Sequence, residues 1–162
     1  MLSLLFCLAF PEPVFAEEFE SGGTGLQIMI VLDCSGSMRR NDPSRSAVHM
    51  VQAFADSIHA ENLEIGYVAY NDTILFSSPP VPMADTAQRQ QLKDAIGQVA
   101  YTGDTDIGLG LSAAYERMSA DSDARKALVL ISDGETDLMD GASRTVEESD
   151  ADLKACVERC RR

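Results

Sequence analysis

The hydrophobic positions of this chain alternate between short apolar runs and longer stretches in which they recur every three or four residues. Residues 26–32 and 127–131 are almost entirely apolar and rich in branched side chains. Runs of this kind are typical of strands buried on both faces of a parallel sheet. Residues 64–70 and 73–77 predict two further strands. The short connection Asn71-Asp72 predicts a hairpin, with its second strand antiparallel at the sheet edge.

Prolines and helix-start residues set the expected limits of these elements. Pro79, Pro80 and Pro82 are expected to end the edge strand, because proline has no amide hydrogen to donate. Asp42 is expected to cap the first helix, with Pro43 at its first position. Apolar stripes at helical spacing predict the helices. The stripes are Ala47, Val48, Val51, Phe54, Ala55 and Ile58; Leu92, Ala95, Ile96 and Val99; Ile107, Leu111, Ala114, Tyr115 and Met118; and Val146, Leu153, Cys156, Val157 and Cys160.

The alternation of strands and helices predicts an α/β fold of one domain. We expect a three-layer, doubly wound, Rossmann-like sheet that is mostly parallel, with one antiparallel edge strand and helices on both faces. Right-handed crossovers would place the carboxyl ends of the first and fourth strands side by side. In open α/β sheets, ligand sites lie just beyond such ends.

Oxygen-bearing side chains stand at both of these ends. Asp33, Ser35 and Ser37 follow the first strand at a spacing of two, and Gly36 allows a tight turn among them. Asp133 follows the fourth strand directly after Ser132 and precedes Gly134. Hydroxyl and carboxylate oxygens are the ligands that hard cations such as Mg²⁺ prefer. The two strand ends therefore predict a divalent-cation site.

A threonine loop lies between these two motifs in the sequence. Thr105 immediately precedes the apolar periodicity of a helix, and Thr102 is its competitor for a place at the site. Asp104 and Asp106 are expected to cap that helix. The acidic loop residues Glu135, Asp137 and Asp140 could form a separate Ca²⁺ site, but a solvated loop is the simpler interpretation.

These three motifs, in this order, resemble the metal-ion-dependent adhesion site of the von Willebrand factor A (VWA) domain family. The resemblance covers residues 25–162 and implies a module that binds another protein. It implies that Ser35, Ser37 and Thr105 coordinate Mg²⁺ directly, while Asp33 and Asp133 hold it mainly through water. An Asp or Glu of the partner protein would then complete the coordination, and Mn²⁺ or Ca²⁺ could replace Mg²⁺.

Two other functions compete with adhesion. A phosphohydrolase could use Asp33 as a nucleophile, but Ser35 stands where such enzymes have a second acid, and neither aspartate loop contains a lysine. The chain also resembles the VWA subunits of ATP-driven metal chelatases, although it has no nucleotide-binding loop of its own. We therefore expect a binding module with no catalytic residues.

The net charge and the first residues of the chain limit the possible binding partners and the cellular location of the protein. The net charge of −13 argues against nucleic acid and anionic membrane surfaces. Residues 1–16 resemble a secretory signal peptide without a basic start, and residues 17–24 a flexible leader, which predicts a secreted or cell-surface protein. Beyond the signal segment we expect no membrane insertion.

Two expectations concern the end of the chain. Members of the family continue after the last helix with at least one more strand and helix, so the resemblance implies a domain incomplete at its C-terminus. Cys156 and Cys160 are interpreted as part of a buried helix stripe, in preference to a strained disulfide or half of a metal site. Cys34 is expected to point into the core.

Overall fold

The computed structural model describes residues 25–58, 60–118 and 123–161. The signal peptide and leader predicted for residues 1–24 lie outside this part of the chain. The described strands form a sheet of order β3-β2-β1-β4, in which β1 pairs in parallel with β2 and β4, and β3 is antiparallel to β2. The strands are β1 (Leu26–Asp33), β2 (Leu63–Tyr70), β3 (Ile74–Pro82) and β4 (Arg125–Ile131). The predicted mixed sheet, with its parallel centre and antiparallel edge hairpin, is confirmed.

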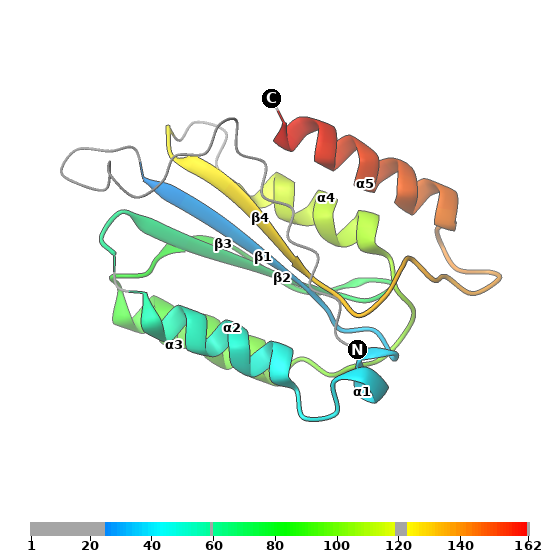
Figure 1. Cartoon of the computed structure of the whole chain (residues 1–162), viewed down its shortest axis with the longest axis horizontal. Helices are drawn as coiled ribbons and strands as arrows, with labels where there is room; N and C mark the ends of the chain where they lie inside the picture. Colours follow the sequence, from blue (N-terminus) through cyan, green and yellow to red (C-terminus); the bar gives the residue numbers. More distant parts are fainter. Residues whose placement is uncertain (1–24, 59, 119–122, 162) are drawn as a thin grey trace.

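Helices cover both faces of the sheet, as the sequence predicts (Figure 1). One face carries α2 (Ser46–Ser57) and α3 (Thr86–Gln98), and the other carries α4 (Ile107–Arg117) and α5 (Val146–Cys160). The sheet has a core on each face: the first core lies under α2 and α3, and the second lies under α4 and α5. Along β1, Ile28, Ile30 and Leu32 belong to the first core, whereas Met29 and Val31 belong to the second. Successive side chains of a strand point to opposite faces. A strand covered on both sides therefore needs apolar residues at every position.

The edge strand β3 continues through the three prolines that were expected to end it. Pro82 lies opposite Glu64 of β2, and the register shifts between Ile65 and Tyr67. Proline is tolerated on an edge strand, where its nitrogen can face away from the neighbouring strand, and at bulges. The prediction that these prolines end the strand was therefore wrong.

The first long helix also begins later than expected. A short helix, α1 (Met38–Asn41), follows the first motif, and α2 begins at Ser46, after Arg45 in a left-handed conformation with φ of 56°. Asp42 still serves this helix, because its carboxylate accepts hydrogen bonds from the Ser46 and Ala47 amides. Asp42 thus binds amides of the first turn, as expected of a cap, but the N-cap position is Arg45, so the prediction of Asp42 as N-cap with Pro43 at the first helical position was wrong. Phe54, expected in the core stripe, is 36% exposed.

Two glycines allow α4 to approach its neighbours closely. A Cβ added to Gly110 would lie 2.5 Å from the Tyr70 ring of β2, as expected for a helix packed close to the sheet. A Cβ on Gly108 would instead lie 2.1 Å from the backbone oxygen of Ser149 in α5. The Gly108 amide donates to the Ser149 hydroxyl at 2.9 Å. Gly108 therefore fixes the distance between the two helices.

Within the described residues, no helix combines the length and the apolar character needed to cross a membrane. Cys34 is fully buried in the first core, as predicted, and Cys156 is buried in the second. Cys160, at the end of α5, packs against the second core.

Candidate metal centre

The centre begins with a carboxylate buried at the end of β1. Asp33 is fully buried; its Oδ1 accepts a hydrogen bond from the Ser35 amide at 2.8 Å, and its Oδ2 accepts one from the Ser132 hydroxyl at 2.6 Å. Burial raises the pKa of Asp33 above its ordinary value, and the hydrogen bonds from Ser132 and Ser35 reduce this rise without cancelling it. A buried carboxylate with so few donors is an environment that a nearby cation would stabilise.

A row of oxygens continues from this carboxylate toward the surface. The Ser35 and Ser37 hydroxyls are 2.9 Å apart, and the Ser37 hydroxyl donates to Asp133 Oδ1 at 3.0 Å. Asn41 of α1 donates to Asp133 Oδ2 at 2.7 Å. The structure thus brings the first motif and the aspartate after β4 into direct contact, although they are almost one hundred positions apart in the sequence.

The threonine loop lies against the first motif through its backbone. The Gly36 amide donates to the Gly103 carbonyl at 2.9 Å, and the Thr102 amide donates to the Cys34 carbonyl at 2.8 Å. Thr105 is buried, and its amide and carbonyl pair with those of Asp137 in the loop after β4. All three predicted segments therefore meet at one end of the sheet. A direct role for the Thr105 hydroxyl stays a prediction.

Three residues that support this arrangement were not recognised in the sequence. Ser132 reaches Asp33 because β1 and β4 are parallel and Leu32 lies opposite Ile131, which places the next residues side by side. Asn71, expected only as a turn residue, donates from its side chain to the Thr102 carbonyl at 2.8 Å. Asn41 is the third. The parallel register, once assumed, could have identified Ser132, whereas the asparagines carry no such signal.

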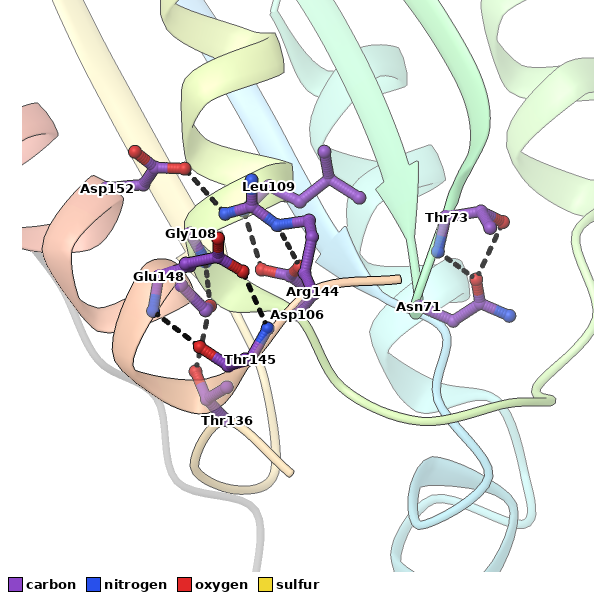
Figure 2. A network of polar contacts seen from close by, with 11 residues as sticks. Asn71, Thr73, Asp106, Gly108, Leu109, Thr136, Arg144, Thr145, Glu148 and Asp152 are labelled. Carbon is purple, nitrogen blue, oxygen red and sulfur yellow. Dashed lines mark hydrogen bonds and ion pairs between the residues drawn. The ribbon is translucent and has the colours of Figure 1, made fainter. Parts of the chain in front are cut away.

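Behind the threonine loop lies a charged network that ties it to α5 (Figure 2). Asp106 is fully buried and accepts from the Leu109 amide at 2.9 Å, which confirms its predicted capping role. The Arg144 guanidinium forms an ion pair with the Asp106 carboxylate at 2.7 Å and a second one with the Asp152 carboxylate of α5 at 2.5 Å. Because Asp106 follows Thr105 directly, this network fixes the backbone on which Thr105 stands.

Asp104, unlike Asp106, does not cap α4. Its carboxylate accepts a hydrogen bond from the Met139 amide at 2.9 Å instead of capping α4, so the prediction that it caps this helix was wrong. The loop residues Glu135, Asp137 and Asp140 are exposed. The described part of the chain contains no group of three or more His, Cys, Asp or Glu residues arranged to hold a metal ion. The candidate centre is of another kind, because hydroxyls make up most of its donors.

The spacing of these donors fits a small octahedral cation. Around Mg²⁺, with metal–oxygen bonds of about 2.1 Å, neighbouring ligand oxygens are about 3.0 Å apart. The Ser35 and Ser37 hydroxyls, two of the ligands expected to touch the metal, are 2.9 Å apart, which is close to that value. Neutral hydroxyls beside carboxylates also form the hard-oxygen set that Mg²⁺ prefers.

Comparison with known proteins identifies the family. Residues 28–135 match the von Willebrand factor type A domain, so this chain belongs to that family. No curated protein matches the sequence.

Solved structures share the fold with this chain. The pilus adhesin SpaC of Lactobacillus rhamnosus GG is 21% identical with a TM-score of 0.62, over 72% of this chain and 16% of its own. The domain of the type V pili tip protein Mfa5 of Porphyromonas gingivalis is 24% identical with a TM-score of 0.60, over 72% and 40%. A von Willebrand factor type A protein of Catenulispora acidiphila is 20% identical with a TM-score of 0.61, over 85% and 31%. This chain therefore spans less than half of each of these proteins.

Proposed function

We propose that this chain is a metal-ion-dependent protein-binding module. Asp33, Ser35, Ser37, Thr105 and Asp133 would hold Mg²⁺, with Mn²⁺ or Ca²⁺ as substitutes, and an Asp or Glu of a partner protein would bind at the same centre. The observation that carries the proposal is the convergence of the Ser35 and Ser37 hydroxyls, which are 2.9 Å apart, with the Asp133 carboxylate, which is 3.0 Å from Ser37. A pilus adhesin and a pili tip protein that share this fold support it.

The residues of the centre divide the work between charge and geometry. The Ser35 and Ser37 hydroxyls are neutral and would leave most of the charge of a bound cation uncancelled. Asp33, held by Ser132 and the Ser35 amide, and Asp133, held by Asn41 and Ser37, supply negative charge in fixed orientations. When bound, Mg²⁺ would supply an electrophilic coordination position for a carboxylate from outside. Supporting hydrogen bonds of this kind are characteristic of metal centres.

Magnesium binding tests the centre directly. Isothermal titration of the full chain with MgCl₂ should give one site, and Asp133→Asn should weaken it about 10- to 100-fold. Asp137→Asn is the matched control, because it removes an exposed carboxylate from the same loop whose hydrogen bonds come from its backbone. Equal Mg²⁺ affinity in the two variants would refute the assignment.

Carboxylate binding tests the function of the centre. A fluorescent peptide with a single Glu should bind the full chain in MgCl₂, and its binding should be lost in EDTA and in the Asp133→Asn variant. Peptide binding that is the same in EDTA would contradict a metal-dependent module even if Mg²⁺ itself binds.

The burial of Asp33 argues against the phosphohydrolase alternative. A carboxylate nucleophile must reach its substrate, whereas both oxygens of Asp33 are engaged and the residue has no exposed surface. A colorimetric phosphatase assay with Mg²⁺ should therefore show no turnover.

We also propose a secreted or cell-surface location for this protein. A pilus adhesin and a minor pilin that share this fold support the proposal.

A further inference from the structure

Two arginines lie directly beside the candidate metal centre. Arg39 and Arg40 lie on α1, two and three positions after Ser37, and both are exposed, whereas the preceding residue, Met38, is buried. The three ion pairs found among the described residues involve Lys93 and Arg144, and neither Arg39 nor Arg40. Within the part of the chain that the structure describes, these two adjacent positive charges form no ion pair, although the net charge of the whole chain is −13.

The backbone that carries these arginines is anchored to the centre. The amides of Arg40 and Asn41 both donate to the Ser37 carbonyl, at 2.8 Å and 3.0 Å. The Asn41 side chain then binds Asp133 at 2.7 Å. The backbone that carries the two arginines is therefore held next to the oxygens that would bind Mg²⁺, and both side chains are exposed.

The opposite side of the centre is acidic. Glu135, Asp137 and Asp140 are exposed on the loop after β4, which is held to the threonine loop by the Thr105–Asp137 pairing and the bond from Met139 to Asp104. In Figure 1, α1 lies toward the layer of α2 and α3, whereas this loop lies toward the layer of α4 and α5. The rim of the centre is therefore positive on one side and negative on the other.

From this charge distribution we infer that the partner presents a cluster of carboxylates, of which one binds at the metal centre and the next pairs with Arg39 and Arg40. This inference rests on the proposed function and specifies the partner of the same site. A uniformly charged polyanion, such as a sulfated polysaccharide, would have to cross the acidic loop, where like charges repel. A protein segment can be acidic at one end only, so it fits a rim with two signs of charge.

The experiment compares two fluorescent peptides on the full chain in MgCl₂, one with a single Glu and one with three consecutive Glu residues. Three Glu residues give a statistical factor of about three at a single carboxylate site, and exposed ion pairs contribute modestly, so two of them should favour the three-Glu peptide by a further factor of about 2 to 20. This further advantage should disappear in Arg39→Gln/Arg40→Gln, leaving the statistical factor, and should decrease with added salt. It should persist in Arg117→Gln/Arg161→Gln, which removes two exposed arginines at helix ends away from the centre.

The outcomes separate this inference from the proposed function. Mg²⁺-dependent binding of the single-Glu peptide, with a three-Glu advantage that is the same in Arg39→Gln/Arg40→Gln as in the unmodified chain, would overturn the inference and leave the function standing. Failure of both peptides to bind in MgCl₂ would overturn both. A heparin oligosaccharide that binds through the two arginines more tightly than the three-Glu peptide would also overturn the inference, in favour of a polysaccharide partner.

Discussion

The contact between Gly108 and α5 gives a sharp test of how the layer behind the metal centre is built. In the Gly108→Ala variant, the new methyl group would lie 2.1 Å from the Ser149 oxygen and 2.7 Å from its carbonyl carbon. Both atoms belong to the backbone of α5, so no side-chain rotation can relieve the overlap. Normal contact requires the two helices to separate by about 1 Å.

The cost follows from what this separation disrupts. Overpacking of a well-packed interface costs about 1–3 kcal/mol. Loss of the buried hydrogen bond from the Gly108 amide to the Ser149 hydroxyl adds about 1 kcal/mol. The higher helix propensity of alanine offsets up to about 1 kcal/mol of this loss in the free energy of unfolding. We therefore expect a net loss of about 1–3 kcal/mol in the free energy of unfolding, and a melting temperature lower by about 3–10 °C.

A second glycine in a helix supplies the control. Gly97 lies within α3, and a Cβ there would meet only the side-chain amide of Gln52 at 3.1 Å, which can move aside. Gly97→Ala should therefore stabilise the chain by up to about 1 kcal/mol. Urea denaturation of the full-length variants, followed by circular dichroism, measures both changes. If Gly108→Ala is as stable as Gly97→Ala, the close packing of α4 on α5 is refuted.

Three further predictions concern polar groups. For Asp42, burial raises the pKa, but the bonds from the Ala47 and Ser46 amides and from the Tyr101 hydroxyl lower it overall. Its stabilising effect should therefore be complete above about pH 4 and be lost as the pH falls through its folded-state pKa. Asp42→Asn should cost about 1–2 kcal/mol at pH 7, and a deficit that does not shrink as the pH is lowered below about 4 in urea denaturation would contradict this. Arg144→Gln should cost about 1–3 kcal/mol, because Asp106 would stay buried without its partner, and a double-mutant cycle with Asp106→Asn that shows no coupling would refute this. Ser132→Ala should weaken Mg²⁺ binding in calorimetry about 10-fold or more, because Asp33 would lose the donor that orients it, whereas unchanged affinity would show that Ser132 has no role.

Local patterns in the sequence predicted the class of fold and the segments of the site. Continuous apolarity in 26–32 and 127–131 predicted buried parallel strands, and β1 and β4 lie side by side with their carboxyl ends adjacent. That adjacency brings Asp33 and Asp133 together, because parallel strands end at the same edge of a sheet.

Features that depend on the neighbour of a residue escaped prediction. Pro79, Pro80 and Pro82 look like strand breakers in sequence, but on an edge strand their nitrogens need no partner. Asp104 and Asp106 were equally good candidates for capping α4 in the sequence. Only Asp106 caps this helix, because the Asp104 carboxylate instead accepts a hydrogen bond from the Met139 amide.

The sequence by itself therefore determined the order and type of the main strands and helices and the segments that carry the oxygens, because periodicity and turn chemistry act over a few neighbouring positions. Only the tertiary structure decided that Ser132 orients Asp33, that Asn41 and Asn71 hold the two loops, and that Gly108 sets the distance to α5. These contacts join segments about 30 to 100 positions apart, and their geometry depends on strand register and helix packing, which no local pattern encodes.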